Sequence, residues 1–343
     1  MKEQHLKICT INLFNYVAPP DAFYDFANIY TQDEWALKTQ WLTRTIANID
    51  PDVIGFQEVF SIDALKSTLA NLGFPHFSTV DEPDIEQDYI CSNPVVAIAS
   101  RYPILNTNPI NTRSAIAKQY PGFEFSRQPI HAVIDVPRLG PTDMYVVHFK
   151  SQRPTQLAVE VKTESVSNAD LSTGNVVEEE PDLKDKWLAE NQGKWLSTIQ
   201  RGMEAHVLHQ HIIETKQHDQ RPCVVMGDFN QSLESNEFHC LTSKHLFRHE
   251  NSRDELSAWH LHNSRELSVE QRETVKKPTY YVGAQGKELD YILLSSEFSS
   301  YSSHTHAVVN HYDVEDSHLV NPRFGIDHVS SDHGIVIVDI SII

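Results

Sequence analysis

The sequence has 343 residues, of which 40% are hydrophobic, and its formal net charge is -19. A chain of this length and composition can bury a large core, and we expect one α/β domain over residues 1–343. The negative charge argues against a protein that wraps long nucleic acid by neutralising phosphates, although a local basic rim could still hold nucleic acid near one point.

No apolar run approaches the ~20 residues that span a bilayer, and the polar start MKEQHLK lacks the apolar core of a signal peptide. The four cysteines are far apart and follow no metal-ligand spacing, which is typical of free thiols in a reducing compartment. They are Cys9, Cys91, Cys223 and Cys240. We therefore expect a cytoplasmic protein without a membrane span.

The first two predicted strands both carry polar side chains near their ends. Residues 6–14 (LKICTINLF) form an apolar run that contains Asn12, an amide that either bonds to backbone or faces a site. Residues 53–56 begin a second buried strand, which ends in Gln57 and Glu58. A carboxylate there is costly unless a metal offsets its charge or Glu58 has simply reached the surface.

Two helices are predicted beside these strands. Apolar residues at helical spacing indicate a helix over residues 33–48, with Asp33 as its cap, and another over residues 61–72 that Gly73 closes. The acidic, turn-rich residues 79–93 predict a loop. These segments indicate packing rather than chemistry.

Three further strands are predicted at residues 94–100, 129–136 and 144–149. Apolar and polar residues alternate in the second of them, which predicts a half-buried strand. A turn over PRLGPTD separates it from the third and predicts a hairpin.

Cations gather around the end of the third of these strands. His148 is followed by Lys150, Gln152 and Arg153, and Arg127 precedes the partner strand. A lone histidine at a strand end is more often structural than catalytic. In so acidic a chain, however, the neighbouring cations indicate an edge that binds anions.

Residues 154–190 contain few large apolar side chains and an acidic run, which predicts a polar insertion. This insertion is either a lid over a site or a solvated surface segment with no part in chemistry. Helical spacing of apolar residues then predicts a long helix over residues 187–216.

The run PCVVMGDFNQS at residues 222–232 predicts a buried strand that ends in a tight turn. Asp228 and Asn230 are two residues apart, so in an extended chain both point to the same side. Such a pair suits a metal, a water or a phosphate oxygen. Alternatively, both side chains bond to local backbone in an Asx-type turn.

The last two predicted strands add acids and a histidine. Residues 288–295 place Asp290 near the start of one strand, and Asp332 and His333 come just before the closing strand. Adjacent residues point in different directions, so we expect His333 to pair with Asp290 rather than with Asp332. A carboxylate that orients a histidine and stabilises its charged form is the arrangement that general base catalysis needs.

Six motifs in this order, INLFN, QEV, HFKS, GDFN, LDYILLS and SDH, resemble those of the endonuclease/exonuclease/phosphatase superfamily. The resemblance runs from about Leu6 to Ile340. It implies a four-layered α/β sandwich, in which two mixed β-sheets pack face to face with helices outside, and a divalent metal at one end. Apurinic endonucleases carry an aspartate where this chain has Phe14, so the resemblance to that branch is weaker.

The resemblance also implies a role for each polar residue. It makes Glu58 the main ligand of Mg2+, or alternatively Mn2+, with Asn12 and Asp332 beside it. His333, oriented by Asp290, becomes the base or electrostatic partner at the reacting phosphate.

The remaining residues are implied to act on the substrate. Asp228 takes part in proton transfer or water activation, while Asn230 and His148 bind the phosphate oxygens. Lys150 and Arg127 are implied to contact the substrate phosphate.

The expected function is a metal-dependent hydrolase of phosphoric esters. The HFKS motif matches nuclease-like bacterial members and favours a phosphodiesterase that acts on DNA or RNA. The acidic balance and the expected lid instead favour a phosphatase for a small or lipid-borne phosphorylated alcohol. A binding protein that kept the fold without activity is a third alternative, against which the complete set of site residues argues.

Overall fold

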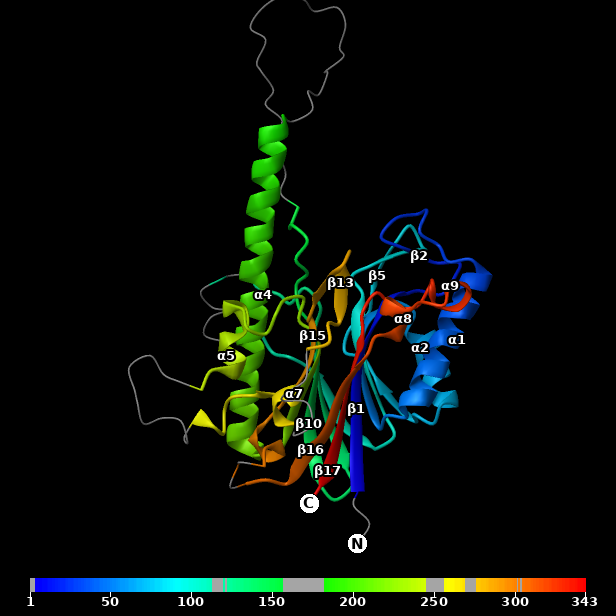
Figure 1. Cartoon of the computed structure of the whole chain (residues 1–343). Coiled ribbons are helices and arrows are strands. Elements are labelled where there is room, and N and C mark those ends of the chain that lie inside the picture. The colour runs from blue at the N-terminus through cyan, green and yellow to red at the C-terminus, as the bar shows by residue number, and fades with distance from the viewer. Residues whose placement is uncertain are drawn as a thin grey trace, which may run out of the picture.

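Two six-stranded mixed sheets pack face to face, and helices cover the outer face of each (Figure 1). The computed structural model describes residues 4–112, 120, 122–156, 182–244, 256–268, 276–300, 302 and 304–343. This is the four-layered α/β sandwich that the sequence predicted.

The first sheet has the strand order β16-β17-β1-β3-β7-β4. Its strands are β1 (Gln4–Tyr16), β3 (Val53–Val59), β4 (His76–Ser78), β7 (Val95–Ser100), β16 (Ala307–Glu315) and β17 (Ile335–Ile342). Strands β1 and β3 are parallel, and the other neighbours are antiparallel.

The second sheet has the order β12-β15-β11-β10-β9-β8. Its strands are β8 (Ile104–Pro109), β9 (Ile130–Val136), β10 (Gly140–His148), β11 (Cys223–Asp228), β12 (His262–Asn263) and β15 (Asp290–Leu294). Here β10 and β11 are the parallel pair. Each sheet thus has its parallel pair near the centre, where the carboxyl ends of two strands lie together.

Smaller elements surround the two sheets. One small sheet holds β2 (Ala22–Phe23), β5 (Asp84–Glu86) and β6 (Ile90–Ser92), and a hairpin holds β13 (Tyr280–Val282) and β14 (Gln285–Lys287). The helices are α1 (Gln32–Ile49), α2 (Ile62–Asn71), α4 (Leu183–Asp219), α5 (His239–Thr242), α7 (Ser264–Leu267), α8 (Ser317–Val320) and α9 (Phe324–Asp327). Two 3-10 turns, η1 (Asn236–Phe238) and η2 (Ser296–Phe298), complete the described elements.

The three largest apolar clusters lie one between each pair of neighbouring layers. Side chains such as Leu6 and Val146 fill the space between the two sheets. A second cluster packs α1 and α2 on the first sheet, and a third packs α4 and α5 on the second. At Gly55 of β3 a Cβ atom would lie 2.9 Å from the Met226 side chain of β11, so the absence of a side chain lets the sheets approach closely.

Several expectations from the sequence are wrong in detail. The cap of α1 is Thr31, which bonds to the Glu34 amide, and not Asp33. Residues 79–93 contain the strands β5 and β6 rather than only loop. Strand β9 is buried on both faces except at Asp135, and on the face that alternation predicted to be open His131 contacts His211 of α4.

The long helix begins earlier than predicted, at Leu183, where Asp182 caps it. Most of the expected insertion, residues 157–181, lies outside the described residues, so the lid stays a prediction. Strand β16 was not predicted, although AVVNHYDVE carries the alternation of a half-buried strand.

Candidate active site

Strand pairing brings the polar strand ends to one edge of the sandwich. Asn12 of β1 lies beside Gln57 of β3, next to Glu58. His148 of β10 lies beside Asp228 of β11, and β15 places Asp290 on the other side of Asp228. The pairing register therefore joins residues that are far apart in sequence, as expected where carboxyl ends of strands meet.

These residues surround a cleft of about 670 Å3. Seven of the ten residues that the sequence predicted line this cleft, namely Glu58, Arg127, His148, Asp228, Asn230, Asp332 and His333. Asn12 and Asp290 lie directly behind them, in contact with Asp228 and His333 respectively. Lys150 is not among the lining residues.

One oxygen of Asp228 is the centre of the site. Its Oδ2 lies 3.2 Å from the side-chain nitrogens of both Asn12 and Asn230, and 3.5 Å from His148 Nε2. The other oxygen accepts the Asn230 amide at 2.7 Å, so the Asx-type turn and the site coexist. Burial and the nearby charge of Asp290 raise the pKa of Asp228 to about 7, although His333 opposes this.

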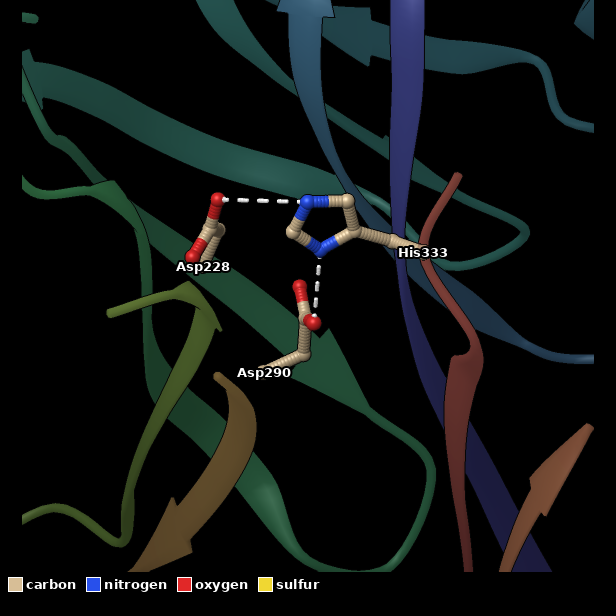
Figure 2. A group of neighbouring side chains, drawn as sticks. All are labelled: Asp228, Asp290 and His333. Carbon is tan, nitrogen blue, oxygen red and sulfur yellow. Dashed lines mark hydrogen bonds and ion pairs between the residues drawn. The ribbon is translucent and has the colours of Figure 1, made fainter. Parts of the chain in front are cut away.

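The predicted pairing of His333 with Asp290 is present (Figure 2). His333 Nδ1 lies 2.8 Å from Asp290 Oδ2, and its other ring nitrogen lies 4.0 Å from Asp228 Oδ2. Burial lowers the pKa of His333, but the charges of Asp290 and Asp228 outweigh burial and hold this pKa well above its usual value. This direction favours the charged form of the ring, whose Nε2 lies on the side of Asp228 and the cleft.

His148 has the opposite character. Burial, together with the positive charges of Arg127 and His333, holds its pKa well below the usual value. The ring is therefore neutral and carries a single N–H. Its Nδ1 has no hydrogen-bond partner among the described residues.

The backbone around the cleft is strained. Phe14, Asn15, Glu58 and Asn230 all have positive φ, between 49° and 60°. Gly227 has a φ of 145°, and a Cβ atom there would lie 2.0 Å from the Val147 carbonyl oxygen, so only glycine fits directly before Asp228. Strain of this kind concentrates where the surrounding structure fixes functional side chains.

A metal site can be tested against the donors near Glu58. The Glu58 carboxylate accepts the Asn15 amide at 3.0 Å and the Asn12 side-chain nitrogen at 3.5 Å, yet it still lines the cleft together with Asp332. Two carboxylates at the mouth of a cleft are hard oxygen donors that fit Mg2+ or Mn2+.

Asn12 fits this metal site less simply. Its amide nitrogen faces Glu58 and Asp228, while its Oδ1 accepts the Phe14 amide at 3.0 Å. An amide binds a metal through oxygen, so the side chain would have to turn over to become a ligand. In the present arrangement Asn12 bridges the two carboxylates.

A different group, Asp228, Asp290 and His333, offers ligand atoms within 4.8 Å of one another. A hydrogen bond already joins His333 Nδ1 to Asp290, so a proton between them accounts for this geometry. Among the described residues, this is the only cluster of three or more acids, histidines or cysteines with such spacing.

Two residues that sequence reasoning missed fix the segment before β17. Lys38 of α1 is buried, and its Nζ donates to the carbonyls of Val329 and Ser330 at 3.2 and 3.1 Å. Burial lowers the pKa of Lys38 to about 7 against the charges of Glu58 and Asp332. A lysine on the apolar face of a predicted helix was the signal that could have identified it.

Ser331 is the second missed residue. Its Oγ donates to the Asn12 carbonyl at 2.6 Å and accepts the His333 amide at 2.9 Å. This serine therefore links the segment that carries His333 to β1. The doubled serine in VSSDH was the only signal for it in the sequence.

The expected anion-binding edge is present only in part. Arg127, Gln152 and Arg153 line the cleft, whereas Lys150 is half-buried beside it. The Lys150 amide donates to Glu204, and its carbonyl accepts from Arg201. Burial and the neighbouring Arg127 lower the pKa of its amine.

The four-layered α/β sandwich, with carboxylates, amides and histidines at one sheet edge, is the fold of a family of hydrolases that act on phosphoester bonds. This chain belongs to the Endonuclease/Exonuclease/phosphatase family, whose model matches residues 26–333. A search of curated proteins finds no match. Among the described residues, no helix is both long and apolar enough to cross a bilayer.

Solved structures share the fold at low sequence identity. The human Nocturnin catalytic domain with bound sulfate is 16% identical, with a TM-score of 0.57, and the match covers 100% of this chain and 98% of that one. A humanized D. rerio TDP2 is 13% identical, with a TM-score of 0.57 and 98% coverage of both chains. A Bacteroides thetaiotaomicron mannosyl-6-phosphatase is 14% identical, with a TM-score of 0.53 and coverage of 98% and 99%.

Proposed function

We propose that this chain is a divalent-metal-dependent phosphoesterase, and that its substrate is a phosphodiester of nucleic-acid type. The observation that carries the proposal is the position of the His333 ring, 2.8 Å from Asp290 and 4.0 Å from Asp228, in the cleft that Glu58 and Asp332 also line. An acid, a base and a candidate metal site thus meet at one point.

Glu58 and Asp332 would hold the metal, with Mg2+ as the expected ion and Mn2+ as an alternative. Asn12 would join them through its oxygen if its amide turns over. When bound, the ion polarises the phosphoryl oxygen and offsets charge on the leaving oxygen.

His333 donates its cleft-facing N–H to an oxygen of the reacting phosphate, where negative charge increases in the transition state. Asp290 keeps the ring in the charged form and in the correct orientation. Asp228, with a pKa of about 7, takes the proton from the attacking water.

Asn230 and His148 bind phosphate oxygens. Asn230 Nδ2 donates to Asp228 at 3.2 Å and to the Phe149 carbonyl at 3.0 Å. Protonation of Asp228 weakens the first of these bonds, which frees that N–H for the phosphate at the step where it is needed.

The charges of the cleft favour a diester over a monoester of a neutral alcohol. Arg127, Arg153 and Lys287 all line the cleft together with the reacting groups, so a substrate with more than one phosphate gains additional contacts. The net charge of -19 favours the second candidate, a phosphatase for a compact phosphorylated alcohol. A binding protein without activity would not need the assembled Asp290–His333 pair.

Parallel assays decide between these candidates. Single-stranded DNA, RNA, p-nitrophenyl methyl phosphate and a panel of phosphomonoesters are each incubated with and without Mg2+. We expect Mg2+-dependent cleavage of the diesters. Turnover of monoesters alone would replace the phosphodiesterase by the phosphatase, and no turnover of any substrate by a folded protein would leave the inactive binding protein.

A further inference from the structure

Beside the reacting groups, the cleft is lined by an aromatic ring and by two arginines that take no chemical step in the proposed reaction. They are Tyr24, Arg127 and Arg153. At about 670 Å3, the cleft is larger than a single phosphate group requires.

The backbone presents Tyr24 in an unusual way. Tyr24 follows β2, and its amide donates to the Cys91 carbonyl at 2.9 Å, which anchors the turn. Its φ is 61°, in the left-handed region that a tyrosine rarely adopts. A non-glycine residue held in this conformation on a cleft wall indicates a functional constraint.

The Tyr24 ring lies nearly perpendicular to two neighbouring aromatic rings and is only partly covered. It packs edge-to-face on Phe60, with ring centres 5.6 Å apart, and lies 6.4 Å from Phe23. The side chain nevertheless remains 47% exposed. An anchored aromatic ring with an open surface is suited to stacking against a flat ligand group.

The two arginines supply positive charge beside this ring. Burial and Glu58 raise the pKa of the Tyr24 hydroxyl, while the charges of Arg127 and Arg153 and a hydrogen bond from Arg127 oppose this effect. Arg153 is exposed at the rim, so its guanidinium is accessible to a ligand. Because the chain as a whole has a net charge of -19 and repels anions, the arginines in the cleft make this a place where an anion can bind.

We propose that Tyr24, Arg127 and Arg153 form a second subsite, in which a nucleobase stacks on Tyr24 and the phosphate next to the reacting one binds the two arginines. The substrate class is then an unpaired nucleic-acid strand, because a base inside a duplex has no free face to stack on the ring. This inference rests on the proposed function and names the substrate class of the same site.

Binding is measured by fluorescence anisotropy with labelled oligothymidylate, in a His333→Ala background that prevents cleavage. Tyr24→Ala should raise the Kd by about 5- to 150-fold, the range for loss of one stacked base. Tyr24→Phe keeps the ring and should stay within about twofold of the parent, because stacking does not need the hydroxyl. Tyr281→Ala, a tyrosine outside the cleft lining, is the matched control.

Salt dependence tests the arginines separately. If the two arginines neutralise the one phosphate assigned to them, they should contribute about 0.7 to the slope of log Kd against log salt, and Arg153→Gln should lower the slope by up to about 0.7. Arg138→Gln, in the exposed turn between β9 and β10, should leave the slope unchanged. The same strand annealed to oligoadenylate should bind more weakly than oligothymidylate alone.

Kinetics distinguish this subsite from the reaction itself. Tyr24→Ala should leave hydrolysis of p-nitrophenyl methyl phosphate unchanged and lower kcat/KM only for the oligonucleotide. Equal losses on both substrates, an unchanged Kd in Tyr24→Ala, or duplex binding as tight as single-strand binding would each overturn the subsite. If the wild-type chain hydrolyses no diester, the proposed function fails, whereas the anisotropy result still decides whether the subsite exists.

Discussion

Two buried aspartate–histidine pairs in this molecule have the same bond length and different surroundings. His333 and Asp290 lie 2.8 Å apart at the cleft, and His131 and Asp143 lie 2.8 Å apart under α4. The strands β9 and β10 place the second pair away from the edge that His148 reaches. The bond alone therefore does not define a catalytic unit.

The surroundings of the second pair are those of a structural contact. The His131 ring stacks on Tyr145 with ring centres 4.5 Å apart, and its Nδ1 lies 3.3 Å from His211 Nε2 on α4. Neither His131 nor Asp143 lines a described cavity. By contrast, His333 lines the cleft and faces a second carboxylate, Asp228, at 4.0 Å.

The largest expected effect tests the cleft pair. His333→Ala should lower kcat by about 10²- to 10⁴-fold, the range for a positioned acid or base, and Asp290→Asn should cost somewhat less. Because the two residues act as one unit, the double variant should be little worse than His333→Ala alone. Steady-state kinetics and the Tm of all three variants provide the measurement.

The alternative is that Asp290 only stabilises the start of β15. In that case Asp290→Asn would lower Tm and leave kcat nearly intact. Losses in kcat that multiply in the double variant, with unchanged Tm, would show independent roles and contradict the pair.

The second pair provides the matched experiment. His131→Leu leaves buried Asp143 with only the Arg221 ion pair at 3.7 Å, which should cost up to about 3–5 kcal/mol in the free energy of unfolding. At a temperature where the variant remains folded, kcat should change by less than about twofold, as for a group that does not touch the substrate. Denaturant unfolding and kinetics on the same preparation check both statements, and a large loss of kcat in folded protein would make the two pairs equivalent.

Glu58→Gln tests the proposed metal site, which lies in the same cleft as His333 and away from the His131–Asp143 pair. Loss of a residue that supports a metal ligand costs about 10- to 100-fold in metal affinity. Loss of Glu58 as a direct ligand should weaken Mn2+ binding at least as much, without unfolding the chain. Calorimetric titration measures the affinity, and Asp143→Asn is the control at the distant pair. Unchanged affinity in Glu58→Gln, or a larger loss in Asp290→Asn, would move the metal to the cluster of Asp228, Asp290 and His333.

Lys150→Ala should have a smaller effect, in KM more than in kcat. The amine is half-buried beside the cleft, whereas Arg127 lines it, so Arg127→Ala should raise KM by a larger factor. Michaelis–Menten analysis on the preferred substrate compares the two variants. Equal losses in kcat and kcat/KM for Lys150→Ala would instead indicate a contact made only in the transition state.

The smallest effect is a pH dependence of stability at the second pair. Burial, with a contribution from His131, lowers the pKa of His211 to about 4 from an ordinary value of 6.5. The neutral ring therefore stabilises the fold above pH 6.5, and this contribution is lost as pH falls towards 4. Chemical denaturation across this pH window should show a shallower loss in His211→Phe than in the parent, and an identical slope would contradict the assignment.

The sequence by itself determined the class of fold and most of the residues that meet at the cleft. Short apolar runs ending in Asn12, Glu58, His148 and Asp228 predict buried strands whose polar ends must meet a partner or a metal, because burial without one is costly. The motif order then indicated the family, and the reasoning that adjacent residues diverge predicted the partner of His333.

Only the tertiary structure decided what depends on register and on neighbouring layers. Alternation predicted that β9 was half open, but α4 from a distant part of the chain buries it and places His211 beside His131. The cleft lining around Tyr24 likewise depends on a turn anchored to Cys91 and on Arg153 from the segment that follows β10. Such contacts carry no periodic signal in the sequence, because long-range packing and not local propensity sets them.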